Sequence, residues 1–294
     1  MGIFNSYLKE GPGVDKNAPK KRGIFLFTEV FFRKFFLLIR ANIIYFLFSL
    51  PFLAISVFIL APVITSALGL ESLINSTSES EIVGVMINFV IGTGVFNLFG
   101  SGPAGAAYAY VCRCFTRSQH TWVWSDGWDK FKENFKHTMF LTVLDVVVIF
   151  VLMTAIRFYS GAMIEVAGPL NGIFGVLKYV IYFVFAFYML MHIFVYQMFV
   201  TYENTFISQI KNSLIFTLIK LPACVFLFIV TAVICIVLGF NLGLLFFPVY
   251  AIIGMSLTRF PLEFYAARVI EKNIEKVCKN EETAQNAGIG ETEE

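Results

Sequence analysis

The sequence predicts an all-α membrane protein, a polytopic bundle of six transmembrane helices arranged as three hairpins, with interfacial amphipathic helices on the cytoplasmic side. Three observations predict this class. Hydrophobic residues make up 58% of the 294 residues and charged residues only 14%, whereas charged residues make up about 25% of a typical soluble domain. The mean hydropathy is +0.77. Uncharged stretches of membrane-spanning length alternate with polar segments that differ strongly in their Lys and Arg content.

The first four crossings follow from the length of these stretches, because a helix needs about 20 mostly apolar residues to cross the hydrocarbon core. Residues 41–70 and 82–112 contain no Asp, Glu, Lys or Arg. Residues 138–156 carry only Asp145, and residues 179–202 carry no formal charge. Each of these four stretches is predicted to cross the membrane once.

The last uncharged stretch, residues 221–258, is 38 residues long. At about 1.5 Å per residue, a single helix of this length is far too long for a core of roughly 30 Å. The sequence GFNLG at residues 239–243 predicts a turn. We therefore expect two crossings, at residues 221–239 and 244–265. A five-crossing alternative, in which the second part only re-enters the membrane, stays open at this point.

The distribution of Lys and Arg predicts the orientation, because cytoplasmic segments carry an excess of these residues. With six crossings and both termini in the cytoplasm, 20 of the 22 Lys and Arg residues lie inside. With five crossings, the basic residues from Arg259 onward would lie outside, so six is preferred. The predicted parts are a basic cytoplasmic N-terminal segment (residues 1–27), a single membrane domain (residues 28–279) and a disordered acidic tail (residues 280–294).

Residues 113–137, called the Trp segment below, contain five Lys or Arg and all three tryptophans. Basic residues interleaved with aromatics are typical of single-strand nucleic-acid binders, but a net charge of only +2 argues against a nucleic-acid partner. Ser125 could cap a helix on which Trp128, Phe131 and Phe135 share one face. We expect this amphipathic helix to lie among lipid headgroups. Its expected interfacial anchors are Trp122, Trp124, Trp128, Phe131 and Phe135.

Similar charged, aromatic segments precede the first and fifth crossings, at residues 28–40 and 206–213. When residues 39–51 (IRANIIYFLFSLP) are aligned with residues 210–222 (IKNSLIFTLIKLP), five of the 13 positions are identical. We interpret the chain as three helical hairpins, each introduced by an interfacial helix. Internal repeats are common in transporters, but they also occur in bundles that transport nothing.

Two features inside the predicted crossings are candidates for a binding site. Gly102 and Pro103 would break the second crossing, and a broken helix at membrane depth can bind a substrate. The small residues around them favour a kink that allows close helix packing. Asp145 would lie within the third crossing, where a carboxylate is costly. We expect it to pair with Arg113 or His192, to face a water-filled vestibule, or to act as a functional group.

Arg113 and Arg117 would share a helix face at the cytoplasmic end of the second crossing. They could bind a lipid phosphate or a partner's carboxylate, although the simpler interpretation is a positive-inside signal. The sequence contains no GxxxxGK[ST], HExxH or GxSxG motif, which excludes an ATPase subunit. No enzyme activity, catalytic residue, metal site or cofactor is predicted.

Two segments resemble a known family. GPGVDKNAPKK at residues 11–21 and GPAGAAYAYVCRCFTRSQHTWVWSDGWDKFKENFK at residues 102–136 are similar to the YesL family, also called the DUF624 proteins. The similarity extends over about residues 1–279. Its Trp-Ser-Asp signature and basic helix add Asp126 and Asn134 to the candidate interaction residues. The resemblance implies a bacterial plasma membrane and a link to carbohydrate ABC transporters, and it assigns no catalytic residue.

The sequence therefore predicts a non-enzymatic accessory membrane protein of carbohydrate uptake. Its expected partners are membrane lipids and the permease subunits of a sugar ABC transporter. The alternative is an autonomous small-solute transporter or channel, with a site near the broken second helix and Asp145. A chain of paired intramembrane charges would favour this alternative.

Overall fold

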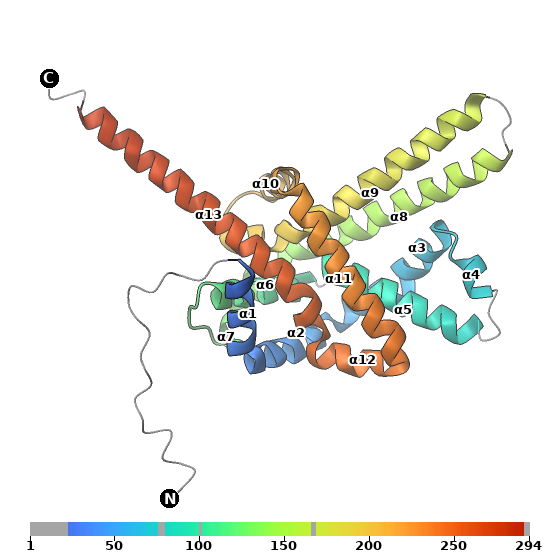
Figure 1. Ribbon diagram of the computed structural model, residues 1–294, viewed down its shortest axis with the longest axis horizontal. Helices are drawn as coiled ribbons and strands as arrows, with labels where there is room; N and C mark the ends of the chain where they lie inside the picture. The colour runs from blue at the N-terminus through green and yellow to red at the C-terminus, as the bar shows by residue number, and fades with distance from the viewer. Residues whose placement is uncertain (1–22, 76–79, 100–101, 166–168, 291–294) are drawn as a thin grey trace, which may run out of the picture.

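The computed structural model describes residues 23–75, 80–99, 102–165 and 169–290, and every regular element in these residues is helical (Figure 1). The α-helices are α1 (Ile24–Arg33), α2 (Phe35–Ile55), α3 (Ala61–Ala67), α4 (Glu71–Asn75), α5 (Ser80–Phe99), α6 (Gly102–Thr116), α7 (Ser125–Glu133), α8 (Phe135–Glu165), α9 (Pro169–Thr201), α10 (Phe206–Ile219), α11 (Leu221–Leu242), α12 (Phe246–Val249) and α13 (Met255–Gly290). Two π-helical turns, η2 (Ser56–Leu60) and η4 (Tyr250–Gly254), and one 3₁₀ turn, η3 (Gly243–Leu245), connect some of them.

Four helical segments of the described chain are long and apolar enough to cross a membrane: Phe35–Ala67, Phe135–Gly161, Gly172–Thr201 and Leu221–Leu242. They correspond to the predicted first, third, fourth and fifth crossings, as expected for a multi-pass membrane protein. The first begins earlier than predicted and includes α2, η2 and α3. In Figure 1, α8 and α9 lie side by side, and their outer halves project from the rest of the bundle.

The predicted second crossing, residues 82–112, is not a single helix. Helix α5 ends at Phe99 and α6 begins at Gly102, which has a φ of +52°. This backbone conformation suits glycine, and Pro103 suits the first turn of the next helix because its missing N–H has no partner to lose there. Every residue of α6 except Tyr110 and Arg113 is buried. The break is confirmed, but α6 belongs to the protein interior.

The predicted sixth crossing, residues 244–265, is also not one straight helix. Helix α11 runs to Leu242, and Gly243 makes the turn with a φ of +53°. The chain then passes through η3, α12 and η4, and it changes direction before α13 (Figure 1). Neither this region nor α5 is among the four spans defined by length and apolarity, so the count of six is not confirmed.

The C-terminal part differs from the prediction too. Helix α13 continues to Gly290, so residues 280–290 are helical where a disordered tail was expected. Glu, Gln and Ala make up five of these 11 residues and favour a helix, but the two Asn and two Gly residues do not, so composition alone does not predict this helix. Residues 291–294 of the predicted tail, and most of the predicted N-terminal segment, lie outside the described residues.

Three short helices are each joined to a long apolar helix by a single residue. The joints are Lys34 between α1 and α2 (φ −103°, ψ 11°), Asn134 between α7 and α8 (φ −93°, ψ 3°), and Lys220 between α10 and α11 (φ −113°, ψ 21°). These similar values lie in the sparsely allowed bridge region, which changes the direction of a helix. In the described chain, three shorter helices therefore precede long apolar helices, although the predicted segment 28–40 includes the joint at Lys34 and the start of α2. The interfacial position of these helices stays a prediction.

The predicted alignment between residues 39–51 and 210–222 does not pair the joints of the two helix pairs. The joints pair Lys34 with Lys220, a shift of 220 − 34 = 186 positions, whereas residues 39 and 210 differ by 171. The aligned prolines also differ in context, since Pro51 lies inside α2 and Pro222 in the first turn of α11. Sequence identity in such apolar segments reflects composition more than structural equivalence.

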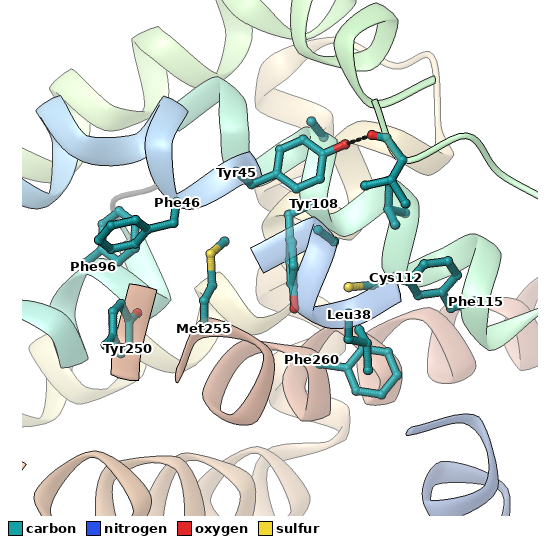
Figure 2. Packing of buried hydrophobic residues seen from close by; sticks show 14 of the residues in the cluster. Leu38, Tyr45, Phe46, Phe96, Tyr108, Cys112, Phe115, Tyr250, Met255 and Phe260 are labelled. Atoms are coloured by element: carbon teal, nitrogen blue, oxygen red, sulfur yellow. Dashed lines mark hydrogen bonds between the residues drawn. The ribbon is translucent and has the colours of Figure 1, made fainter. Parts of the chain in front are cut away.

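Helix α6 lies at the centre and contacts α2, α7, α8, α9 and α13. Its small side chains Ala104, Ala106, Ala107 and Ala109 are fully buried, as expected if they let neighbouring helices approach closely. Figure 2 shows Tyr108 and Cys112 of α6 packed among Leu38 of α2 and Met255 and Phe260 of α13. The polar groups described next lie around this helix.

Candidate functional site

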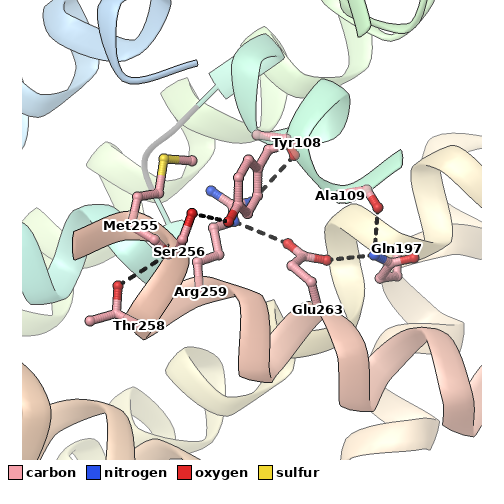
Figure 3. Close-up of polar contacts among 9 residues, drawn as sticks. Tyr108, Ala109, Gln197, Met255, Ser256, Thr258, Arg259 and Glu263 are labelled. Carbon is pink, nitrogen blue, oxygen red and sulfur yellow. Dashed lines mark hydrogen bonds and ion pairs between the residues drawn. The ribbon is translucent and has the colours of Figure 1, made fainter. Parts of the chain in front are cut away.

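An ion pair lies in the interior on α13. The Nε atom of Arg259 is 3.0 Å from Oε1 of Glu263, and the two side chains are 2% and 5% exposed. The guanidinium carbon lies 4.5 Å from the ring centroid of Tyr196. It lies 5.9 Å from the ring centroid of Tyr108 (Figure 3). The aromatic faces and the carboxylate together replace the water that the cation loses on burial.

The same pair connects three helices. Gln197 of α9 donates from Nε2 to Oε2 of Glu263 at 2.7 Å and to the backbone oxygen of Ala109 on α6 at 2.9 Å (Figure 3). Arg259 also reaches the backbone oxygen of Gly105, at 3.5 Å. The contacts of α6, α9 and α13 are therefore fixed by one charged cluster, called the Arg259 cluster below.

This cluster was not predicted from the sequence, because Arg259 was counted among the cytoplasmic basic residues at the end of the sixth crossing. The structure buries Arg259 instead. A signal was present: Arg259 and Glu263 are four residues apart and follow a long uncharged stretch, and charges at this spacing pair on a helix. Four basic residues remain after Arg259 in the sequence, so the predicted orientation does not depend on it.

Asp145 on α8 is paired with α9. Its Oδ1 atom accepts a hydrogen bond from the hydroxyl of Tyr188 at 2.5 Å and lies 2.9 Å from Nε2 of His192. Of the alternatives considered for Asp145, the structure shows the pair with His192. The guanidinium of Arg113 bonds elsewhere. Tyr188 was missed, although it lies four residues before His192 and thus on the same helix face.

The geometry constrains the protons of this pair. Nδ1 of His192 lies 3.0 Å from the backbone oxygen of Tyr188, which can only accept, so we assign a hydrogen to Nδ1. One proton then lies between Nε2 of His192 and Oδ1 of Asp145, bonded either to the imidazole or to the carboxyl group. In both cases the net charge of the pair is zero, which lowers the cost of placing it in an apolar interior. Oδ2 of Asp145 is buried and has no hydrogen-bond partner among the described residues.

A third polar contact joins α2 to the turn before α13. Asn42 donates from Nδ2 to the backbone oxygen of Ala251 at 2.6 Å, and its Oδ1 accepts from the backbone N–H of Ser256 at 2.8 Å. The Ser256 hydroxyl donates to the backbone oxygen of Leu38. A π-helical turn disturbs the regular helix hydrogen bonds, and Asn42 satisfies the backbone groups beside it.

At the end of α6, Arg113 and Arg117 have different partners. Arg113 donates from one terminal nitrogen to the backbone oxygen of Val200 at 2.6 Å and to Oγ1 of Thr201 at 3.0 Å. This contact caps the C-terminal end of α9, where unpaired carbonyl groups attract a cation. Nε of Arg117 lies 3.7 Å from a carboxylate oxygen of Glu271. The predicted pair between Arg113 and Asp145 is not formed.

The Trp segment contains the expected helix, α7, but its start differs from the prediction. Ser125 is not the N-cap; Trp124 holds that position, and no side chain caps the helix. Instead, Oδ2 of Asp126 accepts hydrogen bonds from Thr121 Oγ1 at 3.0 Å and from the backbone N–H of Trp122 at 2.9 Å. Asp126 therefore closes the loop before α7, which is the role that the structure shows for this candidate residue.

The expected anchors do share a face. The rings of Trp128 and Phe131 stack at 5.1 Å, and Phe131 lies 5.8 Å from Phe135. Part of this face packs on Phe48 of α2, whose ring contacts Trp124, Trp128 and Phe131. Trp122 and Trp124 remain 69% and 55% exposed, so an exposed aromatic surface remains beside the bundle.

Helix α7 is fixed to α2 through a close approach. The hydroxyl of Tyr45 donates to the backbone oxygen of Val123 (Figure 2). A Cβ atom at Gly127 would collide with the same hydroxyl group. At the other end of α7, the amide of Asn134 donates to the backbone oxygen of Lys130 at 3.1 Å. Asn134, a candidate interaction residue, thus serves as a structural joint.

Gly102 and Pro103 lie in packed surroundings. A Cβ atom on Gly102 would lie 2.7 Å from the ring of Phe52, so the break is occupied by protein. Among the described residues, a pocket lies elsewhere, between α5, α11 and α12. It has a volume of about 120 Å³ and is lined by Val85, Met86, Phe89, Val90, Gly239, Gly243, Phe246 and Phe247.

These features define the class: a helical multi-pass membrane protein whose interior charges are paired with neighbouring side chains. Within the described ranges, no three His, Cys, Asp or Glu side chains gather as a metal site would require. Comparison with models of known families found no match, and neither the curated proteins nor the solved structures include a detectable relative.

Proposed function

We propose that this chain is a non-enzymatic accessory membrane protein that acts through contacts with other proteins and with lipids, beside a carbohydrate ABC transporter. One observation carries the first part. In the described residues, interior charges pair with each other, as Arg259 does with Glu263 and Asp145 with His192, and the pocket between α5, α11 and α12 is apolar. A helix bundle closed in this way is suited to binding at its surface.

The link to carbohydrate uptake and to a bacterial plasma membrane rests on the resemblance of residues 11–21 and 102–136 to the YesL family. In that family the chains are commonly encoded beside carbohydrate ABC transporters. We therefore propose the permease subunits of such a transporter as the protein partner.

The proposed topology has six crossings and both termini in the cytoplasm. The arrangement in Figure 1 supports it, because α1, α7 and the C-terminal end of α13 lie toward one side of the bundle. Helix α4 and the outer ends of α8 and α9 lie toward the other side. Crossings two and six would then consist of broken helices, of which α6 is buried by its neighbours, as membrane proteins permit.

The test of this function has two parts. Purified and reconstituted alone, the protein should move no sugar into vesicles under a proton or sodium gradient. In cells, its removal should alter sugar uptake only when the cognate ABC transporter is present. Removal without effect on uptake in a strain that contains the transporter would contradict the accessory role.

A second candidate is an autonomous small-solute transporter or channel. Two observations favour it: Asp145 and Glu263 provide two interior carboxylates with partners, and Oδ2 of Asp145 is buried without a hydrogen bond. Interior acids are typical of proton and ion pathways. Gradient-driven uptake by the reconstituted protein that Asp145→Asn abolishes would establish this candidate and reject the accessory role.

A further inference from the structure

Three cations meet at the C-terminal end of α6. The guanidinium of Arg113 and the ammonium of Lys130 both lie over the ring of Tyr110, at 5.4 Å and 5.5 Å from its centroid. Arg117 lies four residues after Arg113 on the same helix. The ring attracts both cations, but it carries no negative charge to neutralise them.

The three cations differ in the carboxylates that the described residues place near them. Lys130 has its own carboxylate, Glu133, at 2.6 Å. Glu271, the acid near Arg117, is also bonded to Arg268 at 2.8 Å. Arg113 contacts only neutral oxygens of α9, and no carboxylate of the described residues pairs with it. The Nε atoms of both Arg113 and Arg117 lack hydrogen-bond partners in this part of the chain.

This arrangement is costly without an anion. Partial burial, followed by the charge of Arg117, lowers the pKa of the Arg113 guanidinium, which means that the charged form is strained in these surroundings. Both arginines keep part of their side chains exposed, so a ligand can reach them from the surface. A bound anion at the exposed parts of the two guanidinium groups would neutralise the repulsion between them.

We propose that Arg113 and Arg117, assisted by Lys130, bind the phosphate group of an anionic phospholipid at this end of the bundle. The planar guanidinium fork fits a phosphate with two parallel hydrogen bonds. The inference names a lipid partner for the proposed interaction protein and rests on that proposal only for its membrane location.

The surroundings favour a lipid as the source of the phosphate. Trp122 and Trp124, which precede α7, are 69% and 55% exposed, and exposed tryptophans of this kind lie at the headgroup level of membranes. Cations next to such residues on the cytoplasmic side are typical of anionic-lipid recognition. A free phosphate ion would satisfy the same cations but would gain nothing from the exposed indole rings.

The experiment measures binding of phosphatidylglycerol to the full chain in mixed micelles of detergent and phosphatidylcholine. Inorganic phosphate is the competitor. Arg113→Gln and Arg117→Gln should each weaken lipid binding about tenfold or more, since each removes a charge-assisted hydrogen bond. The matched control is Lys136→Gln, which removes the same charge from an exposed position at the start of α8 and should change binding less than about twofold.

Arg113→Lys keeps the charge and loses the fork, so its binding should fall between those of the wild type and Arg113→Gln. If inorganic phosphate binds with the same dependence on Arg113 and displaces the lipid, the anion site stands with phosphate as its occupant. Equal weakening by Arg113→Gln, Arg117→Gln and Lys136→Gln would overturn the proposal. Because Arg113 also caps α9, thermal unfolding is measured in parallel, and Arg117→Gln provides the test if Arg113→Gln does not fold. The result leaves the uptake assay of the proposed function unaffected.

Discussion

Arg259 and Glu263 lie one helical turn apart on α13 and form a 3.0 Å ion pair where neither side chain is more than 5% exposed. Through Gln197, the carboxylate of Glu263 is also tied to α9 and to the backbone of α6. Removing a single member of such a pair leaves a buried charge without a partner, whereas removing both charges does not. This asymmetry can be measured.

Glu263→Gln and Arg259→Met should each destabilise the folded protein by roughly 3–5 kcal/mol, because each leaves one uncompensated charge. The double variant Arg259→Met with Glu263→Leu should be more stable than either single variant. Thermal unfolding in detergent, followed by circular dichroism, measures all three. If the two single effects simply add in the double variant, the ion pair is not formed.

Asp145→Asn should destabilise the protein much less than Asp145→Leu. The amide of Asn can donate to Nε2 of a neutral His192 and also bond to the Tyr188 hydroxyl, so no polar group loses its partner. Asp145→Leu leaves both groups unsatisfied, at a cost of about 1–3 kcal/mol for each. Yield and thermal unfolding compare the two variants. Equal damage by Asn and Leu would show that the charge of Asp145, rather than its hydrogen bonds, is required.

Gly127→Ala should displace α7 from α2, because the new methyl group collides with the Tyr45 hydroxyl. Such overpacking costs about 1–3 kcal/mol, and protease cleavage of the Trp segment should become faster. Gly161→Ala is the control, since nothing lies within 4 Å of its added Cβ. Tyr45→Phe combined with Gly127→Ala should restore part of the protection, and no restoration would argue against this contact.

The proposed topology predicts opposite labelling of two positions. Cysteines introduced at Asn75 in α4 and at Asn280 in α13, on a background without the native cysteines, are treated with a thiol reagent that cannot cross the membrane. In intact cells, only position 75 should react. Reaction at position 280 from outside would reject six crossings with a cytoplasmic C-terminus.

Four of the apolar spans could be predicted from the sequence, because the length and apolarity of a segment do not depend on how it packs. The sequence could not predict that α6 lies inside the protein. Residues such as Ala104 and Ala107 are apolar enough for lipid, and only their contacts with α2, α9 and α13 show where they belong. The joints at Lys34, Asn134 and Lys220 were likewise hidden, since no residue type at these positions is specific for a bend.

For the polar candidate residues, too, the sequence predicted which side chains are buried better than it predicted their partners. An interior role for Asp145 was predicted because a lone carboxylate in an apolar stretch must be accommodated. The choice between Arg113 and His192 depended on how α8 is rotated, which the sequence does not contain. Arg259 was counted as cytoplasmic because a charge after an apolar run resembles the end of a crossing, although Glu263 one turn later indicated a pair.

The Arg259 cluster also constrains the order in which the protein is assembled during synthesis. The segment that contains Arg259 and Glu263 is synthesised after α6 and α9, which precede it in the chain. On its own in lipid it would expose both charged side chains to hydrocarbon, at several kcal/mol for each. Gln197 and the backbone of α6 provide hydrogen-bond partners only once these helices are in place. Helices α6 and α9 must therefore be packed before Arg259 and Glu263 can be buried. A truncated chain that ends before residue 259 would therefore leave Gln197 without its acceptor on Glu263 and present that unfinished surface to the quality-control proteases of the membrane.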